Sequence, residues 1–189
     1  TKEKVKIHFY HALSRLGYTV KTSAAAEGTT ITLNQITLAG SDPKSTTETA
    51  KAFYTEGAID LSTGHWKEHS KDAVKQDFNW FSGSEDVTSA SESKPYTNPT
   101  SDYLFVIPQD FSTGNANADQ LYVIVEYDIH YKDIDKTITN KVYKQLTQEF
   151  EQGKAYTINL TIGLTPIEFD VTTVEGWTDI NQVEINSWN

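Results

Sequence analysis

The chain of 189 residues contains no cysteine. This absence excludes disulfides, thiol catalysis and Cys-ligated metals, but it indicates little about the compartment, since a secreted protein does not need disulfides. Methionine is absent too. Because translation starts with Met, we expect that Thr1 is not a native start and that the chain is a processed product or an excised domain.

Basic residues are few: 16 Lys and Arg stand against 26 Asp and Glu, for a net charge of -10. Phosphate backbones and anionic lipids are bound by Lys and Arg clusters, so we expect neither nucleic acid nor a membrane surface as a partner. No apolar run approaches the ~18 residues that a membrane helix needs. We therefore expect no membrane span, and a signal peptide or lipid anchor would lie outside this chain.

The clearest pattern in the chain lies between Gly153 and Trp177. Apolar residues alternate with polar ones in two runs, separated by Gly163 and Pro166, and the apolar positions are Tyr156, Ile158, Leu160 and Ile162, then Ile167, Phe169 and Val171. Alternation with a period of two is typical of a half-buried strand, and a short Gly/Pro loop favours a hairpin. The sequence therefore predicts an antiparallel hairpin with Ile158, Leu160 and Phe169 buried.

Other segments show the same period. The predicted strands are 29–39, 58–61, 74–81, 103–107 with both faces covered, 121–131 and 137–146, with turns at Gly28, Gly40, Gly64 and 133–136. The phase of the alternation shifts by one residue at Ser14–Arg15, within a run from Lys4 to Val20, and at Asn34–Gln35. Each shift predicts a β-bulge. A short helix through Phe9, Leu13 and Leu16 is the alternative for the first.

Two polar stretches have little pattern. Ser41–Gly57 is predicted to be a loop, with one helical turn at Ala50–Tyr54. Ser82–Asp102 is rich in Ser, Thr, Glu and Pro, so we expect a solvated loop that is the least ordered part of the chain. Many short strands, few helical patterns and long polar loops together predict an all-β antiparallel sandwich.

Residues able to carry chemistry are scattered. His65 and His69 have a spacing that suits zinc on a helix, but two exposed loop histidines are the simpler interpretation. His11 lies on an apolar phase, so a core histidine is favoured. Asn115, Asn117, Asp119 and Glu126 have a spacing reminiscent of a calcium loop that lacks its glycine, and a solvated loop is favoured. We predict no catalytic residue, no metal site, no cofactor site and no enzyme activity.

Four aromatic residues could stack on sugar rings, namely Trp66, Trp80, Phe81 and Tyr96, although core packing explains Trp80 or Phe81 at least as well. Trp66 is therefore the candidate glycan-stacking residue. The last segment, 178–189, is a candidate extra strand whose pairing residues are Ile180, Val183, Ile185 and Trp188. These would pair with a sheet edge of the same domain or of a neighbouring subunit. An ordinary final strand or a frayed terminus is the alternative.

Several motifs occur in one order along the chain: HFYHALSRLGYTV, GAIDLSTGHW, LFVIPQ with LYVIVEYDIHY, and GKAYTINLTIGLTPIEFDVTTVEGW. In this order they resemble the carboxy-terminal domain of fimbrillin-like proteins, the fimbrial subunits of Gram-negative anaerobes. The resemblance implies a transthyretin-like Greek-key β-sandwich over residues 1–177, belonging to a longer precursor that is exported as a lipoprotein.

The resemblance also implies a function, which is that of a structural subunit or fimbria-like adhesin at the cell surface and outer membrane. Such subunits polymerise by strand donation after proteolysis, so the expected partners are other fimbrial subunits, with a host or bacterial surface glycan or protein as an adhesion target. The family has no catalytic residues to transfer. A carbohydrate-binding module of a surface lipoprotein is the alternative.

Overall fold

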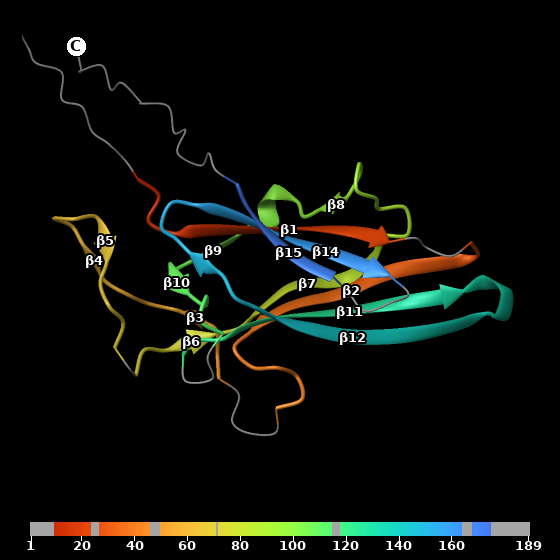
Figure 1. Cartoon of the computed structure of the whole chain (residues 1–189), viewed down its shortest axis with the longest axis horizontal. Helices are drawn as coiled ribbons and strands as arrows, with labels where there is room; N and C mark the ends of the chain where they lie inside the picture. Colours follow the sequence, from red (N-terminus) through yellow and green to blue (C-terminus); the bar gives the residue numbers. More distant parts are fainter. Residues whose placement is uncertain are drawn as a thin grey trace, which may run out of the picture.

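The computed structural model describes residues 10–23, 27–45, 50–70, 72–114, 118–163 and 168–174, and of 168–170 and 172–174 it describes only the backbone. Within these residues all regular structure is β, apart from two single-turn 3-10 helices at Thr100–Asp102 and Lys132–Ile134. Two main sheets face each other across one apolar core (Figure 1). The prediction of an all-β sandwich is confirmed.

One main sheet has the order β15-β14-β1-β8, with β9 also paired to β1. Its strands are β15 (Glu168–Val174), β14 (Ala155–Gly163), β1 (Ser14–Ser23), β8 (Tyr96–Thr97) and β9 (Leu104–Val106). The predicted hairpin is confirmed, since β14 and β15 pair antiparallel without a register shift. The β1–β14 pair is parallel, in contrast to the uniformly antiparallel sandwich that the sequence predicted.

The second main sheet has the order β12-β11-β2-β7 and is antiparallel throughout. Its strands are β12 (Lys136–Leu146), β11 (Leu121–Tyr131), β2 (Thr29–Ala39) and β7 (Phe78–Asp86). The predicted bulge in β2 is confirmed, because Leu33 pairs with Tyr127 and Gln35 with Glu126, which leaves Asn34 as the extra residue. The bulge lets Ile31 and Leu33 share the core face with Ile36 and Leu38.

Three two-stranded ribbons complete the fold. They are β3 (Phe53–Tyr54) with β6 (Lys75–Gln76), β4 (Ile59–Asp60) with β5 (His65–Trp66), and β10 (Gln109–Asp110) with β13 (Glu149–Phe150). The short strand and Gly64 turn predicted for 58–64 are confirmed, and Gly64 has the positive φ of 76° that such a turn needs. The helical turn predicted at Ala50–Tyr54 is wrong, since Phe53 is 1% exposed and its segment is extended.

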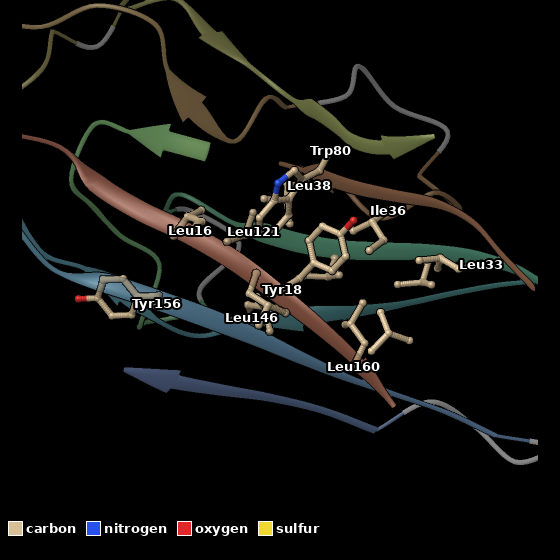
Figure 2. Packing of buried hydrophobic residues seen from close by; sticks show 14 of the residues in the cluster. Leu16, Tyr18, Leu33, Ile36, Leu38, Trp80, Leu121, Leu146, Tyr156 and Leu160 are labelled. Carbon is tan, nitrogen blue, oxygen red and sulfur yellow. The ribbon is translucent and has the colours of Figure 1, made fainter. Parts of the chain in front are cut away.

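The core lies between the inner faces of the two main sheets (Figure 2). Four long strands contribute most of the residues that are 5% exposed or less: Leu16, Tyr18 and Val20 from β1, Ile31, Leu33, Ile36 and Leu38 from β2, Leu121, Val123, Val125, Tyr127 and Ile129 from β11, and Tyr156, Ile158, Leu160 and Ile162 from β14. Burial of Ile158 and Leu160 is confirmed. The side chain of Phe169 lies outside the described part.

The first predicted bulge is wrong. Strand β1 begins at Ser14, and Tyr10–Leu13 is neither strand nor helix, so the shift of phase marks the start of the strand. The register of β1 with β14 is continuous from Arg15 to Ser23. His11, in the segment before β1, is half-buried and not part of the core cluster. The earlier part of the predicted run, 4–9, lies outside the described residues.

The stretch predicted to be a solvated loop, 82–102, is structured over much of its length. Strand β7 continues to Asp86, Val87 is 1% exposed, and β8 pairs with β1. A few apolar residues fix the segment despite its polar composition, and backbone hydrogen bonds such as Thr22 N–H to Ala90 O, at 2.8 Å, attach it to β1. The solvated-loop prediction is therefore wrong here.

Two further predictions need correction. The strand predicted over 74–81 is divided at Asp77 into β6 and the start of β7. The segment 103–107 does form a strand, β9, but it is not covered on both faces, since Phe105 is 52% exposed. Because β9 pairs only with the first residues of β1, it lies at the periphery of its sheet, where one face remains accessible.

Candidate functional site

Sheet edges are the first candidate site, since a backbone that is unpaired on one side can accept another strand. Among the described strands, the main sheets have edges at β15, β12 and β7, and at the short strands β8 and β9. The edges differ in how well their side chains and geometry protect them from pairing. That difference indicates where another strand can be added.

The edge at β12 is protected by charge. Its eleven residues include Lys136, Lys141 and Lys144, and all three are exposed. Lysines on an edge strand disfavour the approach of a second strand, because pairing would bring their charges against another backbone. Lys141 lies 3.6 Å from Glu126 of β11, which adds a cross-strand ion pair on the outer face.

The edge at β7 is protected by its shape. The register between β2 and β7 shifts twice, between Leu33 and Gln35 and again between Ile36 and Thr37. Bulges bend an edge strand and increase its twist, so a straight incoming strand would meet few aligned hydrogen-bonding groups. Strands β8 and β9 are only two and three residues long and therefore offer little backbone.

The edge at β15 has no lysine and no register shift, and its charged residues are the carboxylates Glu168 and Asp170. Seven consecutive residues pair with β14, from Thr161 with Glu168 to Ala155 with Val174, and no register shift interrupts them. The segment 168–174, EFDVTTV, contains no Lys, Pro or Gly. No described strand pairs with its other side. Among the long described edges, β15 is therefore the most favourable for adding a strand.

The predicted pairing residues of the tail, Ile180, Val183, Ile185 and Trp188, lie outside the described residues. The described chain closes with Val174, the last residue of β15. In the sequence, residues 175–177 separate the tail from β15, which is an edge strand among the described strands. That the tail pairs with a sheet edge remains a prediction.

Trp66, the predicted glycan-stacking residue, lies on the β4–β5 ribbon and is half-buried. Its Nε1–H donates a hydrogen bond to the carbonyl of Ala12, at 2.6 Å, in the segment that leads into β1. A Cβ at position 57 would lie 2.8 Å from the indole ring, so Gly57 permits this close packing. The indole therefore attaches the β4–β5 ribbon to the chain before β1, and glycan stacking remains a prediction.

The two histidines of the zinc hypothesis do not converge. His65 is exposed, whereas the ring of His69 stacks on Tyr54 with centroids 3.8 Å apart and lies 6.4 Å from the ring of Trp66. Among the described residues no three His, Asp or Glu are grouped closely enough to hold a metal ion. Two of the four residues in the calcium hypothesis, Asn115 and Asn117, lie outside the described part of the chain. The other two, Asp119 and Glu126, form ion pairs with lysines.

Of the other aromatic candidates, Trp80 belongs to the core and Phe81 and Tyr96 pack against it. Trp80 is 8% exposed and donates from Nε1 to the carbonyl of Asp102, at 2.8 Å. Its ring meets that of Tyr18 edge-on, with centroids 5.0 Å apart, and Phe81 and Tyr96 pack around the same tyrosine. Burial raises the pKa of both the Tyr18 and Tyr96 hydroxyls. These rings stabilise the sandwich, and Phe81 and Tyr96 are half-buried, as Trp66 is.

A polar cluster was missed by sequence reasoning. Gln109 is 8% exposed, and its Nε2 donates to Ala52 O at 2.8 Å and to Asp119 Oδ2 at 2.6 Å. Lys75 forms an ion pair with the other oxygen of Asp119 and lies over the ring of Tyr54, 4.3 Å from its centroid. The residues of this cluster are far apart in the sequence. The one sequence signal that could have indicated the cluster is the polar residue Gln109 directly after the apolar run 103–107 and Pro108.

No helix in the described part of the chain is long and apolar enough to cross a membrane. Comparison with known proteins places the chain in a family. A fimbrillin-like family model matches residues 1–177. The fimbrium subunit Fim1C of Phocaeicola vulgatus is 30% identical over 206 aligned positions, which cover 98% of this chain and 53% of the relative.

A solved structure has a similar fold. A fimbrial protein of Bacteroides vulgatus ATCC 8482 superposes with a TM-score of 0.58 at 22% identity, over 89% of this chain and 55% of that protein. The chain therefore spans about half the length of each of these two relatives. The match of the family model over almost the whole sequence shows that the chain belongs to the fimbrillin-like family.

Proposed function

We propose that this domain is part of a structural subunit of a bacterial fimbrium, and that it acts by strand pairing and not by catalysis. The similarity to a fimbrium subunit supports this proposal. The observation that carries it is the β15 edge, which pairs with β14 over seven residues without a register shift and has none of the lysines found on β12. A fimbrial subunit must accept neighbours, and an exposed edge provides aligned backbone donors and acceptors.

The subunit would work at the cell surface, with other fimbrial subunits as partners. As the sequence resemblance implies, we propose that residues 1–177 form the carboxy-terminal domain of a longer precursor, exported as a lipoprotein to the outer membrane. The second sheet agrees with a role in a polymer, because its long β12 edge is exposed yet protected by three lysines. Such protection restricts which edge a neighbouring subunit can use.

In this proposal residues 178–189 act as the added strand, and the acceptor is the β15 edge of a neighbouring subunit. Val183 and Ile185 would project to one side and fill apolar pockets, while the backbone would supply most of the hydrogen bonds. Ile180 and Trp188 fall in the opposite phase and would contact the other face of the sheet. Pairing with the β15 edge of the same domain is the intramolecular alternative.

The test is to remove residues 178–189 and compare the thermal stability and the self-association of the two proteins by light scattering and analytical ultracentrifugation. We expect the shortened protein to keep its melting temperature but to lose polymerisation, because the tail contacts another subunit. A full-length variant with Val183→Asp and Ile185→Asp should behave in the same way. A synthetic peptide of residues 178–189 should inhibit assembly of the full-length protein.

Two other outcomes would contradict the proposal in different ways. If the shortened protein polymerises as well as the full-length protein, the tail is only a terminus. If the shortened protein unfolds at a lower temperature, the tail is a strand of its own sandwich, and the strand that joins subunits must be a different segment.

A further inference from the structure

A cavity of about 360 Å³ opens where the end of β2 meets the start of β6 and the residues before β11. It is lined by Gly40, Ala50, Lys51, Ala73, Lys75, Ala118, Asp119 and Gln120. Its volume lies within the range of sites that bind small molecules. Neither β15 nor Trp66 is among the described residues that line it.

One wall of the cavity is held by Asp77. Its Oδ1 accepts hydrogen bonds from the N–H groups of Gly40, at 3.0 Å, and Ala52, at 3.1 Å, and its Oδ2 accepts one from Lys51 Nζ, at 2.7 Å. Position 40 must be glycine here, because a Cβ would lie 2.4 Å from the carbonyl carbon of Lys51. Segment 50–52 is thus fixed against the end of β2.

Another part of the lining presents Asp119 in a fixed orientation. One carboxylate oxygen accepts from the ammonium of Lys75, and the other accepts from Nε2 of the buried Gln109. The side chain of Asp119 is nevertheless 28% exposed and that of Lys75 20%, so both remain accessible from the cavity. A carboxylate held by a buried amide and an ammonium is preorganised for a ligand, since little side-chain freedom is lost on binding.

The charges of the cavity select the class of ligand. Each of its two lysines is paired with an aspartate, so the site is locally neutral in a chain with a net charge of -10. An anion would be opposed by the carboxylate of Asp119, and an apolar ligand would desolvate the charged groups without replacing their hydrogen bonds. A neutral molecule with several hydroxyls avoids both costs.

Adjacent carboxylate and ammonium groups match neighbouring sugar hydroxyls, because each hydroxyl both donates and accepts a hydrogen bond. The methyl groups of Ala50, Ala73 and Ala118 offer apolar contact to the C–H groups of a sugar ring. We propose that this cavity binds one neutral sugar residue, with Asp119 accepting from one hydroxyl and Lys75 donating to the next. The domain would then carry an adhesive site in addition to its assembly surface.

The experiment uses the full chain, labelled with ¹⁵N, and titrates it separately with glucose, galactose, mannose, fucose and N-acetylglucosamine. At least one sugar should shift the amide signals of Lys75, Ala118 and Gln120 in a saturable manner. Asp119→Asn should weaken the binding of that sugar by about tenfold or more, the effect of losing one hydrogen bond to a charged group. The control Glu126→Gln also removes the carboxylate of a Lys pair, and its binding should be unchanged.

Asp119→Asn also disturbs Lys75 and Gln109, so a second variant keeps the test decisive if the first is unstable. Ala118→Phe, at an exposed position, places a ring in the cavity without removing any of these hydrogen bonds. This variant should abolish the sugar-induced shifts while its other amide signals remain those of the folded protein. The proposal is overturned if none of the five sugars shifts the cavity signals, or if Ala118→Phe binds a sugar as well as the unmodified chain.

Discussion

Leu160→Ala tests the register of the β14–β15 hairpin and the core behind it. Leu160 is fully buried, between Val20 of β1 and Phe169 of β15 in the pairing of the sheet. The substitution removes three carbon groups at about 0.8 kcal/mol each, or about 2.4 kcal/mol in transfer free energy. The cavity left behind adds to this, so we expect the free energy of unfolding to fall by about 3–4 kcal/mol.

Urea denaturation followed by tryptophan fluorescence would measure the loss as a lower midpoint at an unchanged slope. The melting temperature should fall by roughly 6–16 °C, at about 2–4 °C per kcal/mol for a domain of this size. The matched control is Thr161→Ala at the next position, which is half-buried on the opposite face and should cost less than about 1 kcal/mol. Equal losses in the two variants, or a larger loss for Thr161→Ala, would refute the register, because a slip of one residue exchanges the faces of the strand.

Three further predictions concern other parts of the fold. Deletion of Asn34 removes the extra residue and leaves Ile31, Leu33, Ile36 and Leu38 in unbroken alternation, so this variant should fold, whereas deletion of Thr32 should prevent folding, since one end of β2 would then turn its apolar residues to solvent; circular dichroism would distinguish them, and the reverse outcome would contradict the bulge. Trp66→Phe removes the hydrogen bond to Ala12 and should lower the free energy of unfolding by about 1 kcal/mol in urea denaturation, while an unchanged midpoint would show that this bond does not contribute. Burial raises the pKa of Tyr18 and Tyr127, so the stability that their neutral hydroxyls contribute is fully present below pH ~10 and is lost as the pH rises through their folded-state pKa values. The absorbance of tyrosinate should therefore rise together with loss of the fold above that pH. Complete ionisation of the tyrosines in a folded protein would contradict this prediction.

Local alternation determined the long strands. Strands β11 and β14 follow from a period of two that each segment displays by itself, and the Asn34 bulge follows from one shift of that period inside a continuous run. The same kind of shift before Arg15 had a different meaning, because it marked the beginning of β1. A change of phase shows that the alternation is interrupted, but only the pairing partners decide whether the strand continues beyond it.

The family motifs could likewise be recognised from the sequence, because they are short and contiguous. The packing of the 82–102 stretch could not be predicted from the sequence, because its composition is polar on average while single residues such as Val87 fill the core. Its attachment depends on where β1 lies, and that is a property of the whole sandwich.

Tertiary structure alone decided which residues meet. The parallel pairing of β1 with β14 joins segments from opposite parts of the chain, and no local pattern specifies a strand's neighbour. That β15 and β12 are edge strands among the described strands likewise requires the order of strands in each sheet. Lys75, Gln109 and Asp119 come from three separate segments, and their hydrogen bonds exist only because the packing of the short ribbons against the sandwich brings those segments together.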